Sequence, residues 1–221
     1  MKRFALFLLC TALLGTLAGC RRNVPQETDG SIVPSTQQNT PSTQQTQQTQ
    51  PSESTAPSMP AGTSNTDSAK ILQKIWDSYG DDQKFAAYGG AVEQSVADAP
   101  GDLDITVTEE LTSRYLLPQE QLNAVDEGAS LVHLMNNNIF TAVVFRLSGQ
   151  TDAKAFADSW RSSLRSTQWI CGQPDRMLLA QVENNHVLLA FGSQDAMTVF
   201  QQKLTEAYPD SKTFYQEAVG A

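Results

Sequence analysis

The chain has 221 residues, a formal net charge of −9 and 40% hydrophobic residues. Residues 67–221 alone contain 11 Lys and Arg against 21 Asp and Glu, so this part of the chain repels nucleic acids and lacks the basic patch that a nucleic-acid-binding protein needs. Because about 155 residues suffice to bury a hydrophobic core, we expect 67–221 to form one globular domain.

The first 19 residues have the pattern of an export signal. Lys2 and Arg3 precede an apolar run from Phe4 to Leu17. Since this run of about 14 residues is shorter than the roughly 20 that a membrane-spanning helix needs, it predicts a removable signal peptide.

Small residues then stand directly before a cysteine, as Ala18-Gly19-Cys20. This segment resembles the lipobox of bacterial lipoproteins. The resemblance implies cleavage between Gly19 and Cys20 and acylation of the Cys20 thiol with palmitate or a similar chain. The mature protein would then be held by this lipid on the extracytoplasmic face of the cell membrane.

Residues 20–66 consist mainly of Ser, Thr, Gln and Pro after the cysteine. Because so few apolar side chains are available to offset the entropy of ordering, we expect a disordered tether. A flexible chain of this length spans about 35–40 Å on average. A glycosylated stalk or a peptide-docking segment is the alternative.

The first part of the domain contains several helical patterns. Asp67 is a candidate N-cap for a helix that ends near Gly80. Its apolar stripe comprises Ile71, Leu72, Ile75, Trp76 and Tyr79. Residues 103–107 alternate as a strand, Thr108 is a candidate cap for a short helix through Leu111, and Pro118 begins another to about Val125.

The second part of the domain predicts an antiparallel sheet. Two β-rich runs, 129–135 and 139–147, flank an Asn136-Asn137-Asn138 hairpin loop. A helix over 152–165, a hairpin of 177–182 with 186–191, and a helix capped by Ser193 follow, while 213–215 fits an edge strand or a helical tail. We therefore expect an α+β fold with helices mainly on one face and a ferredoxin-like β-α-β-β-α(-β) order in its C-terminal half.

Cysteine and histidine offer little for catalysis. Cys10 leaves with the signal and Cys20 carries lipid, so Cys171 is the only remaining thiol and no internal disulfide is expected. A nucleophilic Cys171 would need His133 or His186 as its base. Free cysteines are more often small core residues, His133 fits a half-buried strand position, and His186 fits a solvated hairpin position.

Motifs for metals and cofactors are missing. No zinc, nucleotide, P-loop, EF-hand or serine-nucleophile pattern occurs. Asp98, Asp102 and Asp104 form a carboxylate grouping, but their spacing fits no calcium loop. We therefore predict no metal, no cofactor and no catalytic residue.

Two turn-rich stretches stand out as a candidate binding surface. Asn136, Asn137 and Asn138 lie beside Phe140, and the turn 168–175 contains Trp169 and Cys171. If the two turns meet at one end of the sheet, they form a polar surface with an aromatic rim that suits a ligand or a protein. If they lie apart, both are ordinary structural turns.

Beyond the lipobox and the tether, the chain carries Ile75-Trp76, Tyr88-Gly89-Gly90, Gln168-Trp169-Ile170-Cys171-Gly172 and Pro174-Asp175. With these motifs it resembles lipoproteins of unknown function from Gram-positive, clostridial-type anaerobes, some of which are labelled bacteriocin-transport accessory lipoproteins. The resemblance implies no mechanism and transfers no catalytic residue.

From these features we expect a non-enzymatic binding or accessory module of the cell envelope, whose partner is an envelope protein or a small ligand. A thiol enzyme that uses Cys171 with His133 or His186, and a small-ligand-binding lipoprotein of a transporter, are the alternatives.

Overall fold

The computed structural model describes residues 66–170 and 172–220. The expected signal peptide, lipidated Cys20 and most of the tether lie outside the described residues, as does Cys171. The helices are α1 (Asp67–Asp77), α2 (Thr108–Ser113), α3 (Ala153–Ser166) and α4 (Gln194–Ala207), with 3-10 turns η1 (Val92–Gln94) and η2 (Gln119–Ala124). The strands are β1 (Ala87–Gly89), β2 (Val96–Ala97), β3 (Gly101–Asp102), β4 (Val125–His133), β5 (Phe140–Leu147), β6 (Arg176–Val182), β7 (His186–Gly192) and β8 (Lys212–Ala218).

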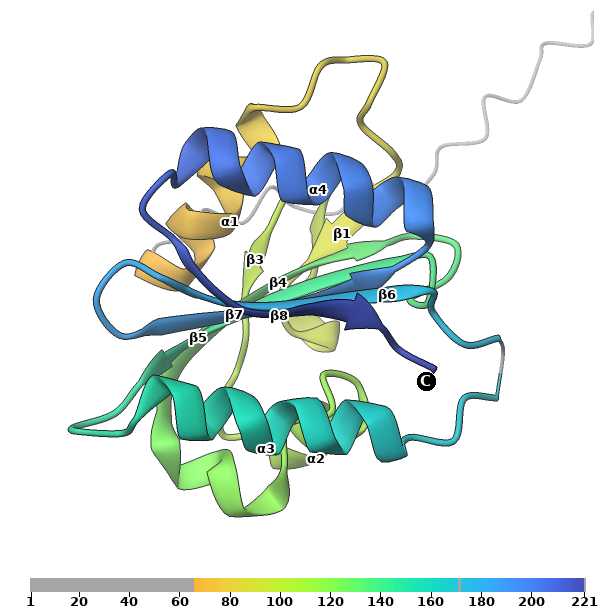
Figure 1. The fold of residues 1–221 in the computed structure, drawn as a ribbon. Helices are drawn as coiled ribbons and strands as arrows, with labels where there is room; N and C mark the ends of the chain where they lie inside the picture. Colours follow the sequence, from red (N-terminus) through yellow and green to blue (C-terminus); the bar gives the residue numbers. More distant parts are fainter. Residues whose placement is uncertain (1–65, 171, 221) are drawn as a thin grey trace, which may run out of the picture. The chain divides into compact units, whose positions relative to one another are not determined.

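All eight strands join one sheet, in which every pairing is antiparallel (Figure 1). The strand order is β2-β1-β4-β5-β7-β6-β8, and β3 pairs with β4 beside this path. The predicted α+β class and antiparallel sheet are confirmed. The two predicted hairpins are β4–β5 and β6–β7, and the final segment is an edge strand rather than a helical tail.

Helices cover both faces of the sheet, which corrects the expectation that they lie mainly on one. The side chains of α1 and α4 pack into one hydrophobic core, and those of α2 and α3 pack into another on the opposite face (Figure 1). Strands β5 and β7 supply residues to both cores, and all seven residues of β7 are buried. Such two-sided burial needs a cover on each side.

Strand order explains why α3 and α4 separate. The units β5-α3-β6 and β7-α4-β8 each cross one strand in the same direction along the sheet, yet β5 and β7 run antiparallel. A right-handed crossover, the hand that nearly all such connections have, therefore places the two helices on opposite faces. In a ferredoxin-like sheet the last strand lies beside the first, but here β4 occupies that side of β5 and β8 pairs with β6 instead.

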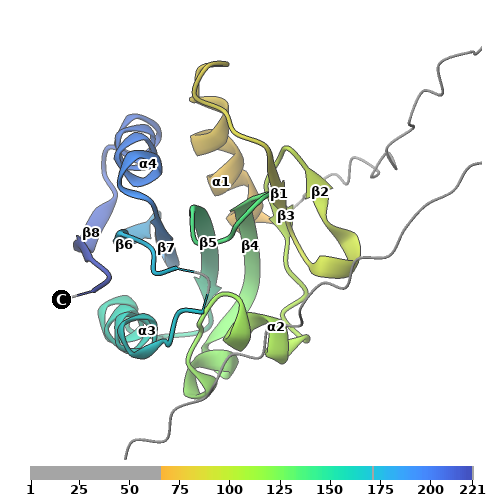
Figure 2. The same ribbon diagram turned by 90° about the vertical axis from the view of Figure 1, so that its right-hand side faces the viewer.

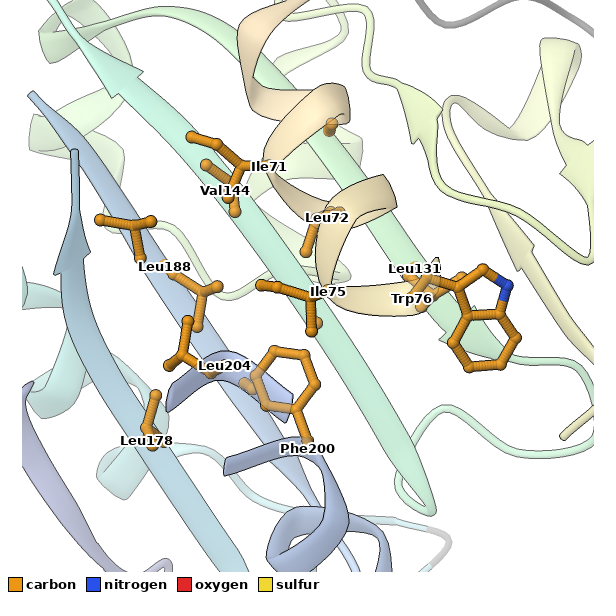
Figure 3. Close-up of a cluster of buried hydrophobic side chains, with 14 of the residues drawn as sticks. Ile71, Leu72, Ile75, Trp76, Leu131, Val144, Leu178, Leu188, Phe200 and Leu204 are labelled. Carbon is orange, nitrogen blue, oxygen red and sulfur yellow. The ribbon is translucent and has the colours of Figure 1, made fainter. Parts of the chain in front are cut away.

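The first core forms where α1 and α4 meet the central strands (Figure 3). All five side chains of the predicted α1 stripe are buried, with exposures of 6% or less. Burial of each large apolar side chain contributes about 1.5–3 kcal/mol. The stripe therefore accounts for the docking of α1.

Helix caps follow local sequence with two corrections. Asp152 and Ser193 accept hydrogen bonds from the N–H groups of Ala155 and Ala196, as N-cap side chains do. The cap of α1 is Thr66 rather than Asp67, because the Thr66 hydroxyl accepts from Ala69 N–H. Thr108 is the first helical residue of α2 rather than its cap.

The elements within residues 80–125 differ from those predicted, and the short strands β1 and β2 form where a loop was expected. The expected strand over 103–107 is a loop, and the strand pairing falls on Gly101 and Asp102 instead. The expected helix after Pro118 is the 3-10 turn η2. Figure 2 shows that β1 and β3 lie beside β4 on this side of the molecule, that β2 lies beyond β1, and that α2 lies below them.

Candidate functional site

The β4–β5 loop and the connection from α3 to β6 meet at one end of the sheet, on the right in Figure 1. The side-chain amide of Asn138 donates a hydrogen bond of 2.6 Å to the backbone carbonyl of Gly172. Within the loop, the Asn136 side chain accepts from the N–H of Asn138 at 2.8 Å. The Thr141 hydroxyl donates to the Asn137 carbonyl at 2.9 Å. The asparagines therefore fold the loop locally and connect it to the second turn.

The aromatic residues proposed for this surface do not form its rim. Phe140 is fully buried, and its ring centroid lies 5.2 Å from those of Phe85 and Phe200, so its assignment to the surface is wrong. Phe140 begins β5 and belongs to the core under α1 and α4. Trp169 is half-buried and packs 5.5 Å from Phe191 on the other face. Cys171 lies outside the described residues.

Aliphatic side chains are exposed at this end instead. Six large hydrophobic residues are exposed within 66–170 and 172–220, namely Val92 (57%), Val107 (45%), Leu134 (57%), Met135 (80%), Ile139 (37%) and Ile170 (95%). Leu134, Met135 and Ile139 belong to the β4–β5 loop, and Ile170 belongs to the connection that Asn138 binds. One exposed aliphatic residue is ordinary, whereas a concentration of them indicates an interaction site.

The other two exposed residues, Val92 and Val107, line a groove of about 810 Å³. Its walls come from residues 91–94, from 102–104, and from 107–114 around α2. Asn137 also lines the groove and so joins it to the β4–β5 loop. We call this feature the α2 groove. A volume in this range is typical of ligand sites.

A polar network forms one wall of the α2 groove. The Tyr88 hydroxyl donates to Asn137 Oδ1 at 3.1 Å and accepts a hydrogen bond from Arg114. The Arg114 guanidinium also lies over the Tyr88 ring, 5.1 Å from its centroid, and pairs with Glu110 at 3.3 Å. Because Tyr88, Arg114 and Asn137 come from three separate segments, the network fixes the position of each segment relative to the others.

Ser130 on β4 forms hydrogen bonds that hold the segments next to this wall in place. Its buried hydroxyl accepts hydrogen bonds from Gly90 N–H at 3.1 Å and from the Tyr115 hydroxyl at 2.9 Å. The backbone packs so closely here that a Cβ on Gly89 would lie 2.3 Å from Gly101 N and 2.4 Å from Ser130 O. Glycine is therefore required where β1 and β3 approach β4.

The α2 groove carries strong negative charge. Its lining includes the carboxylates of Glu93, Asp102, Asp104, Glu109 and Glu110, against the single guanidinium of Arg114. The pKa of Asp104 is lowered because its carboxylate accepts hydrogen bonds from Thr106. Across the described part of the chain, no hydrogen bond or ion pair engages the carboxylates of Glu93 and Glu109, which are exposed. These charges remain available to a ligand.

His186 lies at the opposite end of the sheet and is buried rather than solvated, which corrects the sequence expectation. Its side chain is 7% exposed, and neither ring nitrogen has a hydrogen-bond partner among the described atoms. Its Nε2 atom lies 3.8 Å from Glu127, which binds Arg146 at 2.6 Å. Burial lowers the pKa of His186, although the nearby carboxylate of Glu127 opposes this shift.

His133 is half-buried at the end of β4, as its strand pattern predicted. Its Nδ1 atom accepts a hydrogen bond from Met135 N–H at 3.2 Å, and its ring stacks on Phe85 at 5.2 Å. Burial lowers its pKa below the ordinary value of 6.5. Through these contacts His133 helps to order the start of the β4–β5 loop.

No protein-family model, curated protein or solved structure matches the chain. In the described residues, no helix is both long and apolar enough to cross a membrane. The same residues contain no group of three or more His, Cys, Asp or Glu side chains placed to hold a metal ion. Asp102 and Asp104 line the α2 groove, whereas Asp98 accepts a hydrogen bond from Ala87 N–H.

Sequence patterns identified the two turns but missed the α2 groove. Its lining comes from segments that are adjacent only because β1 and β3 both pack on β4. The available signals were the Tyr88-Gly89-Gly90 motif and the acidic residues around 102–110. Neither signal indicates which strand these segments pair with, so neither predicts the position of the α2 groove.

Proposed function

We propose that the chain is a lipid-anchored binding or accessory module at the extracytoplasmic face of the cell membrane. The export-signal pattern and the Ala18-Gly19-Cys20 segment support the anchor. The observation that carries the binding role is the position of the six exposed large hydrophobic residues. All six belong to the convergent turns or to the α2 groove, and Asn137 and Asn138 connect these features.

The same geometry gives less support to a thiol enzyme that uses His186. Gly172, the residue after Cys171, lies at the end of the sheet where Asn138 binds it. His186 pairs with Arg146 at the far end of β7. The seven residues of β7 extend for about 20 Å, so Gly172 and His186 lie far apart.

Cross-linking on intact cells tests the proposal. Full-length protein with a C-terminal tag is cross-linked and recovered, and co-purified proteins are identified. We expect a specific envelope protein, and we expect its yield to fall when Met135→Ser and Ile170→Ser are combined, because the two exposed apolar side chains are lost.

Gln150→Ser serves as the control, because Gln150 is exposed beyond the far end of β5. This variant should recover the same partner at the wild-type yield. Equal recovery from the Met135→Ser, Ile170→Ser protein would place the contact elsewhere and contradict the proposed surface.

A further inference from the structure

The α2 groove combines apolar and acidic groups in one recess. Val92, Val107 and Leu103 supply apolar surface, and the carboxylates of Glu93, Glu109 and Asp104 are exposed beside it. Apolar surface favours a ligand with hydrophobic groups. The negative charges favour a cation and repel phosphates and carboxylates.

A single metal ion does not fit this arrangement. The described residues bring no three metal-ligating side chains together, so the carboxylates are distributed along the α2 groove. Carboxylates that are spread along a groove pair best with a ligand that carries several positive groups at separate positions. Lys and Arg side chains along a polypeptide have this property and also carry apolar stems that can lie against Val92 and Val107.

The exposed surface also continues beyond the α2 groove. Asn137 lines it, and the next residue, Asn138, binds Gly172 beside the exposed Ile170. A ligand that fills the α2 groove can therefore extend over the β4–β5 loop and contact Met135 and Ile170. A peptide segment reaches this far, whereas a small amine fills the groove alone.

We infer that the α2 groove binds a basic, apolar polypeptide segment of a partner protein. Charge complementarity selects this occupant over two others. The chain's own residues 21–65 contain only Arg21 and Arg22 as basic residues, next to the expected lipid on Cys20. A second copy of the domain is itself acidic. The inference rests on the proposed binding function and specifies the chemistry of its partner.

Peptide binding to the full-length, lipid-anchored protein in phosphatidylcholine nanodiscs provides the test. Three fluorescein-labelled peptides of equal length are compared by anisotropy, with empty nanodiscs as the blank. One alternates Lys and Arg with Val and Leu, one replaces the apolar residues with Ser and Gly, and one replaces the basic residues with Glu. We expect the first to bind most tightly, the second to bind more weakly and the third not to bind.

Charge variants locate the site. Glu93→Gln with Glu109→Gln should weaken binding of the first peptide about three- to tenfold, as the loss of two exposed ion pairs predicts. Asp81→Asn with Asp210→Asn makes the same charge change at two exposed sites outside the α2 groove. This control should leave affinity unchanged, and equal weakening in both double variants would overturn the inference.

A photo-cross-linker identifies the occupant directly. With p-benzoylphenylalanine in place of Val107, we expect capture of the first peptide. Capture of residues 21–65 or of a second copy, in place of the peptide, would overturn the inference. If the first peptide does not bind but cells still yield an envelope partner whose recovery depends on Met135 and Ile170, the inference of a basic segment is wrong. The proposed binding function is then still supported.

Discussion

The Asn138 side chain connects two turns that are 34 positions apart in the chain. Asn138→Ala removes its hydrogen bond to Gly172 and should lower the free energy of unfolding by about 0.5–1 kcal/mol, since the bond is exposed. The clearer effect should be local, with faster hydrogen exchange at the Asp175 amide, whose N–H donates to the Gly192 carbonyl at 2.9 Å. Asn184→Ala, in the turn of the other hairpin, is the control, and similar exchange in both variants would contradict a coupling role for Asn138.

His186 makes stability depend on pH near neutrality. Because burial lowers its pKa in the folded protein, the unfolded chain binds a proton more readily, with an ordinary pKa near 6.5. Stability from the neutral imidazole is therefore complete above about pH 6.5 and falls as the pH drops below it, by at most about 1.4 kcal/mol per pH unit. Urea unfolding between pH 8 and pH 5 measures this slope.

The variant His186→Leu should flatten that slope. Its effect at pH 8 should be small, because the imidazole nitrogens have no hydrogen-bond partners among the described atoms and Glu127 keeps its bonds to Arg146 and to Ser68 N–H. His133 also has a lowered pKa and should account for the remaining slope. An unchanged slope in His186→Leu would show that His186 does not carry the effect.

Single positions were predicted well where a local pattern decides the outcome. The Asn136–Asn138 turn and the Ser193 cap follow from side chains that bond their own backbone neighbours. The burial of Phe140 and His186 was predicted wrongly, because the burial of a strand residue depends on which side chains pack over the strand. Phe85 and Phe200, which enclose Phe140, are 55 or more positions away in the sequence.

Helix α1 depends on a residue at the very start of the described chain. Thr66 caps α1 and also donates a hydrogen bond of 2.5 Å to Asp102, which lines the α2 groove. Thr66→Ala should lower the free energy of unfolding by about 1 kcal/mol, the usual effect of losing a cap. Thr66→Ser keeps the hydroxyl and should lose about half of that or less. Urea unfolding of the full-length variants compares them, and equal losses would argue against the cap.

Among whole elements, the long ones were predictable and the short ones were not. Helices α1, α3 and α4 and strands β4 to β7 have apolar periodicity over seven or more residues. Strands β1, β2 and β3 have two or three residues each; β1 and β3 form by pairing with β4, and β2 forms by pairing with β1. The α2 groove depends on these short strands, so its position could not be read from local sequence.

At the scale of the whole molecule, the strand order places the candidate binding surface and the charged group around His186 at opposite ends of the sheet. The exposed apolar residues and the α2 groove gather around the β4–β5 loop, whereas the buried His186 and its neighbours Glu127 and Arg146 lie at the other end of β5 and β7. The position of β4 beside β5 sends β8 to the far edge and divides the helices between two faces. Element order alone did not predict this division, because it does not specify the edge to which β8 returns.

The lipid anchor is the remaining prediction for the whole molecule. If Cys20 is acylated, cells fed an alkyne-tagged palmitate analogue should label the protein, and the protein should sediment with membranes. Cys20→Ser should abolish labelling and release exported protein from the membrane fraction, because a thiol is the acceptor and the signal run is too short to span a bilayer.

Cys10→Ser is the matched control, since Cys10 lies within the expected signal peptide and should be absent from the mature chain. It should leave labelling and fractionation unchanged. Continued membrane association and labelling of Cys20→Ser would contradict the anchor at this residue. The α2 groove would then have to be tested in protein without the anchor, because the inferred peptide contact does not depend on the lipid.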